Sequence, residues 1–112
     1  AVNSLCDEAA FTAFGITVDG RMKPDIMALG MGTTVIGFNG HIGSKSGTSF
    51  ASPIVCGLTA CLWQAYPQLT NKQLIEIMRG SSDRSSNPEL PYGYGIPDLN
   101  KAIELAEAIV NP

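Results

Sequence analysis

The most apolar part of the chain lies in its middle, from about Ser49 to Ala65. Its hydrophobic residues leave no polar face at helical spacing, and this pattern predicts an α-helix that is buried on every side. Pro53 fits such a helix only in the first turn, where its missing N–H is not needed. We therefore expect the helix to begin close to Ser49.

Two shorter helices are predicted after this one. Thr70 followed by Gln73 is the pattern of a capping box, so a helix is expected from Thr70 to Arg79, with Gly80 as its terminator. A third helix is expected to start near Asp98. Its apolar stripe comprises Leu99, Ala102, Ile103, Ala106 and Ile109.

Short extended segments precede the helices. Phe11–Phe14 and Ile26–Ala28 are expected to be extended, and Thr33–Phe38 is β-branched and aromatic, which is typical of a strand. Asn39–Gly40 follows this strand directly. The pair predicts a two-residue hairpin turn in which both residues have positive φ.

These elements are too few to enclose a helix that is buried all round. Two amphipathic helices and a few short strands cover only part of its surface. We therefore expect residues 1–112 to be one part of a larger α/β domain. The sequence also starts without Met, and its first residues read as the interior of a longer protein, so the missing leader segment carries no information on targeting.

Composition argues against several other classes of protein. The net charge is −3, and the seven Lys and Arg residues form no basic stripe, which argues against a nucleic-acid partner. The longest apolar run, Ile54–Trp63, is too short to span a membrane. The three cysteines have no metal or redox spacing, and we interpret them as small buried hydrophobic residues. They are Cys6, Cys56 and Cys61.

Several blocks of the sequence match the motifs of one enzyme family, in the same order. Residues 47–57 read Gly-Thr-Ser-Phe-Ala-Ser-Pro-Ile-Val-Cys-Gly, where subtilisin-like serine peptidases have Gly-Thr-Ser-Met-Ala-(Ser/Thr)-Pro-His-Val-Ala-Gly. Phe11–Gly15 resembles the Phe-Ser-Ser-x-Gly of that family, and Lys23–Gly30 resembles its Lys-Pro-Asp-(Ile/Val)-x-Ala-Pro-Gly. Tyr92–Gly95 resembles its closing Gly-x-Gly segment. The chain thus resembles the carboxy-terminal part of a subtilisin-like (subtilase) catalytic domain.

The resemblance implies the carboxy-terminal portion of a three-layer α/β fold, with a parallel sheet, a buried nucleophile helix, a β-hairpin and two further helices. It implies that Ser49 is the nucleophile of a serine endopeptidase and that the backbone N–H of Ser49 donates to the oxyanion. The first turn of a helix suits both roles, because its N–H groups are unpaired and its end is positive. The implied substrate-binding residues, on the leaving-group side, are Lys45, Ser46, Gly47, Thr48 and Phe50.

The triad is incomplete within these residues. The single histidine, His41, matches no motif of the family, and we interpret it as an exposed hairpin residue. The resemblance implies that the Asp, the His and the oxyanion Asn lie upstream of Ala1, so the 112 residues alone are expected to be inactive. No His follows Ser49, which excludes the order found in α/β-hydrolases.

Two alternatives to a nucleophile remain open. Serine is a common helix N-cap, so Ser49 could have a purely structural role. Phe50, Ile54 and Leu29 stand where the family has Met, His and Pro. These departures leave a non-catalytic relative, retained as an interaction domain, as the alternative function.

The remaining expectations concern ligands, partners and location. No metal cluster is evident, and calcium is suggested by the resemblance alone. The expected partners are a peptide or protein substrate, the upstream part of the same domain, and a second copy associating through the apolar helix. Secretion or attachment to the cell envelope is likewise implied only by the resemblance.

Overall fold

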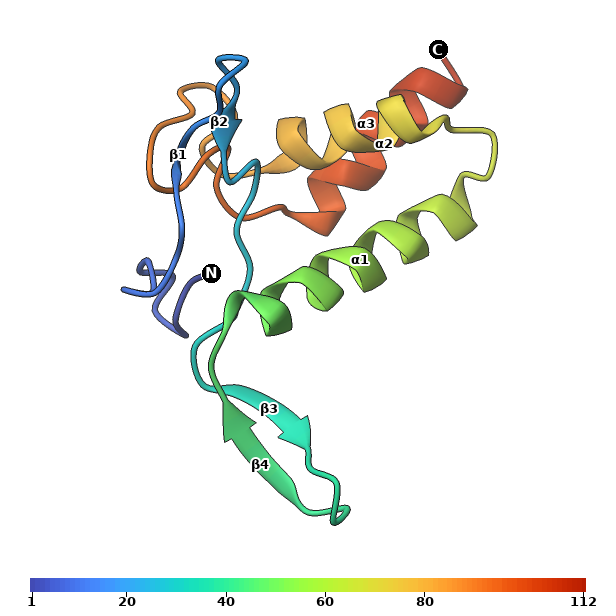
Figure 1. Cartoon of the computed structure of the whole chain (residues 1–112). Coiled ribbons are helices and arrows are strands. Elements are labelled where there is room, and N and C mark those ends of the chain that lie inside the picture. Colours follow the sequence, from blue (N-terminus) through green and yellow to red (C-terminus); the bar gives the residue numbers. More distant parts are fainter.

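Three helices carry most of the regular structure in the computed structural model, which describes residues 1–112 (Figure 1). They are α1 (Thr48–Ala65), α2 (Asn71–Ser81) and α3 (Leu99–Val110). α2 and α3 lie against each other, and the carboxyl end of α1 approaches both. The main core forms at this junction. It consists of Leu62, Leu69, Leu74, Ile77, Met78, Ala102 and Ala106.

α1 begins one residue from the expected start and, as predicted, the other elements cover only part of its surface. Only Ala51 and Leu62 of this helix are buried, because α2 and α3 cover one flank at its carboxyl end. Ile54 remains 43% exposed and Trp63 47% exposed. Within the chain, most of the surface of α1 is therefore exposed to solvent.

The prediction that Pro53 lies in the first turn of α1 is wrong. It is the sixth residue of the helix, within the second turn. At that position its missing N–H removes the donor that would bond the carbonyl of Ser49. The proline therefore costs α1 one backbone hydrogen bond, whereas in the first turn its missing N–H would have cost none.

The predicted capping box of α2 is confirmed. The Thr70 hydroxyl accepts from the Gln73 N–H at 3.3 Å, and the Gln73 side chain accepts from the Thr70 N–H at 2.8 Å. The predicted end at Gly80 is wrong, because the helix continues to Ser81. A Cβ at Gly80 would lie 3.3 Å from Leu105 Cδ1, so this glycine allows α3 to pack closely.

α3 starts as expected, with the Asp98 carboxylate accepting from the Lys101 N–H at 3.0 Å. Its stripe is only partly buried. Ala102 and Ala106 are fully enclosed, whereas Ile103 is 40% exposed. Leu105 packs against the core on the other side of the alanines. The helix is therefore rotated slightly from the orientation that the sequence pattern indicated.

Two separate antiparallel hairpins replace the parallel sheet in these residues. β1 (Gly15–Ile16) pairs with β2 (Met22–Lys23), and β3 (Thr33–Ile36) pairs with β4 (Ile42–Lys45). The strand expected at Phe11–Phe14 is wrong, since those residues form a turn and irregular chain.

One parallel contact joins the start of the chain to the segment after β2. Val2 forms an isolated parallel bridge with Leu29. The Val2 N–H donates to the Ala28 carbonyl at 2.9 Å, and the Gly30 N–H donates to the Val2 carbonyl at 3.0 Å. The parallel character that the resemblance implied is thus limited to this bridge.

The hairpin between β3 and β4 closes through three residues, not two. The Gly37 N–H donates to the His41 carbonyl, and the Gly40 N–H donates to the Gly37 carbonyl, both at 2.9 Å. Gly40 has a φ of 78°, and Asn39 is not among the residues with positive φ. A turn followed by a left-handed glycine needs only one positive φ, which explains the longer loop.

The three cysteines are exposed and unpaired, so the interpretation of them as buried residues is wrong. Cys56 and Cys61 lie on α1, whose uncovered surface leaves them accessible. No helix combines the length and apolar character required to cross a membrane.

Candidate active site

Ser49 is the second residue of α1, at the point where the β3–β4 hairpin joins the helix (Figure 1). Gly47 is the N-cap residue of α1. Its N–H donates to the Gly30 carbonyl at 2.7 Å, and the Gly32 N–H donates to the Ser46 hydroxyl at 3.0 Å. Two hydrogen bonds to the segment at residues 30–32 therefore hold the loop in front of Ser49.

Close packing fixes the same loop. A Cβ at Gly30 would lie 2.8 Å from the Gly47 carbonyl oxygen and 3.3 Å from the Ala51 Cβ. A contact of 2.8 Å is too short for a carbon atom, so only glycine lets the backbone at residue 30 lie this close to the start of α1. The position of the first helical turn depends on this contact.

Ser49 leaves both of its polar groups free. Its side chain is exposed, and its hydroxyl takes part in none of the side-chain hydrogen bonds. Its N–H donates to no carbonyl, whereas the neighbouring Phe50 N–H donates to Gly47 at 3.1 Å. Because Gly47 is the cap, Ser49 is not the helix N-cap. One residue therefore presents a hydroxyl and a backbone donor at the positive end of a helix.

The structure does not bring His41 to Ser49. His41 directly precedes β4, at the end of the hairpin that is farther from α1 in the sequence. Four strand residues at about 3.3 Å each separate it from the base of the hairpin by about 13 Å. No histidine or carboxylate bonds to the Ser49 hydroxyl, so this chain holds no base for it.

The other predicted site residues lie on the same approach to Ser49. Lys45, Ser46 and Thr48 are exposed, and Gly47 is half-buried. The ring of Phe50 packs beside the loop, with two ring carbons 3.6 Å from where a Cβ at Gly47 would lie. These residues come together at the joint between β4 and α1.

Phe50 also borders a hollow of about 840 Å³ along the hairpin. Val35, Gly43 and Lys45 line the same hollow. Phe50 replaces Met beside the serine, so the residue that departs from the family motif forms a wall next to Ser49.

Asp25 is a charged residue whose role the sequence patterns do not indicate. Its carboxylate accepts hydrogen bonds from the Lys23 ammonium and the Arg79 guanidinium. Burial raises the pKa of Asp25, but the hydrogen bonds and the positive charges of these two partners outweigh it, so the pKa lies below its ordinary value. The pair with Arg79 ties the segment before Gly30 to α2. Lys23-Pro24-Asp25 was recognisable as a motif, but nothing local pointed to a partner 54 residues away.

Comparisons with known proteins agree with the motif match. A family model described as "Subtilase family" matches residues 1–96. Serine protease AprX of Bacillus subtilis is 31% identical over 106 residues, covering 82% of this chain and 24% of that protein. C5a peptidase of Streptococcus pyogenes is 32% identical over 73 residues, covering 62% of this chain and 6% of that protein.

A solved structure extends the likeness to the fold. The CspB protease of Clostridium perfringens superimposes with a TM-score of 0.71 at 25% sequence identity. The superposition covers 88% of this chain and 23% of that one. The matched part of the chain therefore covers less than a quarter of the length of each of these three proteins.

Proposed function

The chain belongs to the subtilase family, and from that premise we propose that it supplies the nucleophile of a serine endopeptidase acting on peptide or protein substrates. The observation that carries the proposal is the state of Ser49. Its hydroxyl and its N–H are both free, at the exposed first turn of a helix.

The proposed reaction uses these two groups in sequence. The Ser49 Oγ attacks the carbonyl carbon of the scissile peptide bond, and its proton passes to a base supplied by polypeptide outside residues 1–112. The carbonyl oxygen becomes an oxyanion that accepts from the Ser49 N–H, favoured by the positive helix end. The C–N bond then breaks, and the amine leaves with the proton. Water hydrolyses the resulting ester and releases Ser49.

Substrate contacts follow from the geometry of the loop. We assign the leaving-group side to Lys45, Ser46, Gly47 and Thr48, which lie directly before Ser49, and to Phe50, which forms the adjacent wall. Metal ions have no part in this proposal. No group of three or more His, Cys, Asp or Glu side chains gathers within these residues.

A fluorophosphonate tests the nucleophile directly, because it reacts only with an activated serine. The natural protein that contains this sequence is labelled, digested and mapped by mass spectrometry. We expect the adduct on Ser49, and we expect Ser49→Ala to abolish labelling. Ser52→Ala, three residues along the same helix, is the matched control and keeps the label. An adduct elsewhere, or none on protein with native circular dichroism, contradicts the proposal.

A non-catalytic subtilase relative is the second candidate function. It is favoured by the departures at Phe50, Ile54 and Leu29. This candidate predicts a folded natural protein that takes up no fluorophosphonate at any serine.

For the location of the protein, we propose secretion or attachment to the cell envelope. The support is the family resemblance alone. Cell fractionation followed by immunoblotting tests it, and recovery of the protein only from the cytosolic fraction contradicts it.

A further inference from the structure

The β3–β4 hairpin stands away from the helices and leads into the turn of chain that carries Ser49 (Figure 1). The hollow of about 840 Å³ that Phe50 borders extends along this hairpin, and Lys45 lines it as well. Both residues are assigned above to the leaving-group side of the proposed peptidase site. The substrate residues that follow the scissile bond would therefore extend along this hollow.

One face of the hairpin is bare in the middle. The strand register places Lys45 opposite Thr33 and Gly43 opposite Val35. Because side chains alternate along a strand and paired residues share a face, Lys45, Gly43 and Val35 lie on the same side of the hairpin. A Cβ at Gly43 would have no atom within 4 Å. The glycine therefore leaves room beside Val35 for an apolar side chain of a bound peptide.

The charge of the hollow is positive. The chain contains ten Asp and Glu residues, but none of them lines the hollow. Its ionisable side chains are those of Lys45 and His41, which lie on the same face of the hairpin on either side of Gly43. The hollow thus presents positive charge in a chain whose net charge is −3.

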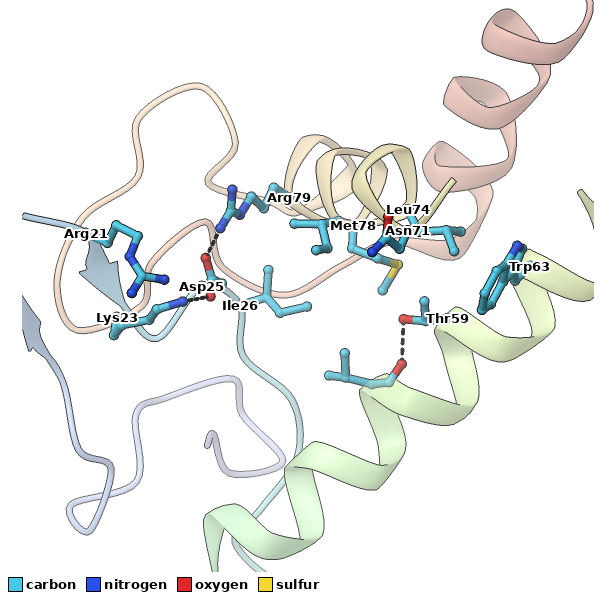
Figure 2. A pocket seen from close by; sticks show the side chains of 12 residues that line it. Arg21, Lys23, Asp25, Ile26, Thr59, Trp63, Asn71, Leu74, Met78 and Arg79 are labelled. Atoms are coloured by element: carbon cyan, nitrogen blue, oxygen red, sulfur yellow. Dashed lines mark hydrogen bonds and ion pairs between the residues drawn. The ribbon is translucent and has the colours of Figure 1, made fainter. Parts of the chain in front are cut away.

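Lys45 has no acceptor within the chain. Most of the other basic side chains have one; Lys23 and Arg79, for example, both bond the carboxylate of Asp25 (Figure 2). The Lys45 ammonium takes part in no ion pair and no hydrogen bond, and the residue is exposed. All three of its N–H donors are therefore available to an acceptor from another molecule.

The backbone that carries this ammonium is held in place. Lys45 is the last residue of β4 and is paired with Thr33 across the hairpin. The next residue, Ser46, accepts at its hydroxyl from the Gly32 N–H at 3.0 Å. Only the side chain of Lys45 would lose freedom when an anion binds, which keeps the entropic cost of that contact small.

From these observations, we propose that Lys45 selects substrates that carry Asp or Glu among the first three residues after the scissile bond. The substrate carboxylate pairs with the Lys45 ammonium, and an apolar side chain of the same segment packs over Gly43 against Val35. Three extended residues span about 10 Å, which keeps the carboxylate near the base of the hairpin, where Lys45 lies four residues before Ser49. This inference rests on the proposed peptidase function and names its substrate class.

The sites that the enzyme cuts test the proposal. The natural protein that contains this sequence is incubated with a mixture of synthetic peptides of varied sequence, and the cut sites are identified by mass spectrometry. At one of the first three positions after the cut, we expect Glu and Asp to exceed Gln and Asn by about three- to fivefold, the effect of one exposed ion pair. Added salt should reduce this preference, because both charges are screened.

Variants assign the preference to one side chain. Lys45→Met should remove the preference for Glu and Asp over Gln and Asn, Lys45→Arg should keep it, and Lys45→Glu should reverse it in favour of Lys and Arg. Lys72→Met is the matched control, because Lys72 is also exposed and unpaired but lies on α2. This control should show the natural preference. Circular dichroism verifies that each variant is folded.

The possible failures are distinguishable. Cleavage with equal use of Glu and Gln at all three positions overturns this proposal and leaves the peptidase proposal intact. A preference that survives in Lys45→Met would assign it to another group, and an equal loss in Lys72→Met would assign it to net charge, so either result also overturns it. If the natural protein cuts no peptide, the peptidase proposal is contradicted, and this one with it.

Discussion

The two ends of α1 differ in how completely their backbone groups are hydrogen-bonded. Its carboxyl end joins the Leu62 core, where neighbouring helices are capped by the side chains of Thr70 and Asp98. Its amino end has no side-chain cap, leaves the N–H of Ser49 unpaired and exposes Ile54. The saturated end contributes Leu62 to the core, whereas the unsaturated end offers an unpaired N–H to other molecules. Apolar side chains are exposed at both ends, Ile54 at one and Trp63 at the other.

The largest test of this contrast is a pair of substitutions on α1. Leu62→Ala, at 1% exposure, should lower the free energy of unfolding by about 2–5 kcal/mol, because it removes contacts and leaves a cavity. Ile54→Ala, at 43% exposure, should lower it by less than about 1 kcal/mol. Urea unfolding followed by circular dichroism measures both. Equal losses would mean that the two ends of the helix do not differ.

Self-association should depend on the unsaturated end. We propose that copies of the chain associate through the exposed flank of α1, because apolar patches of this kind are seldom left in water. Ile54→Lys should weaken association by about tenfold or more, as expected when one buried isoleucine is lost from a contact. Sedimentation velocity over a range of concentrations measures this.

Ile36→Lys is the matched control for association. Ile36 is 77% exposed, but it lies on the hairpin rather than on α1. A larger effect of this control would move the contact from α1 to the hairpin, and a monomer at every concentration would rule association out.

Helix capping gives a smaller difference between the two regions. Thr70→Ala removes the hydroxyl of the capping box and should lower the free energy of unfolding by about 1 kcal/mol. Thr48→Ala, at the uncapped start of α1, should change it by no more than about 0.5 kcal/mol. Thermal unfolding of both variants tests this, and a larger effect of Thr48→Ala would indicate a capping role at α1.

Of these tests, lowering the pH should produce the smallest change in the free energy of unfolding. The lowered pKa of Asp25 means that its contribution to stability is complete above the ordinary value of 3.8 and is lost as the pH falls through the folded-state pKa. We expect protonation of Asp25 to lower the free energy of unfolding by about 1 kcal/mol or less, because its ion pair with Arg79 is partly exposed to solvent. Urea unfolding at a series of acidic pH values measures it. Asp25→Asn should remove this loss, and Glu104→Gln, on the exposed face of α3, should retain it.

Local patterns predicted the parts of the structure that local interactions decide. The capping box at Thr70 and the start of α3 at Asp98 need only neighbours within one turn, and both are confirmed. The start of α1 near Ser49 follows equally from the apolar run and from the motif. What these share is that the residues forming the interaction are adjacent in sequence.

Tertiary contacts decided the parts that the sequence did not predict. Gly80 resembles a helix terminator, but close packing of Leu105 gives it a place inside α2. The exposure of Cys56 depends on which flank of α1 the other helices cover, and no apolar pattern identifies that flank. The ion pair between Asp25 and Arg79 joins two segments, and no pattern in either segment indicates the other as its partner.

The contact between Gly30 and Gly47 means that catalytic activity in related proteins also depends on the residue at position 30. Any residue with a side chain at position 30 would have to push the Gly47 carbonyl away, and the first turn of α1 would tilt with it. A mutation there could therefore misalign the hydroxyl of Ser49 while every residue of the serine motif stayed intact. A homologue with an intact Gly-Thr-Ser motif could therefore be inactive because of an alanine at position 30 alone.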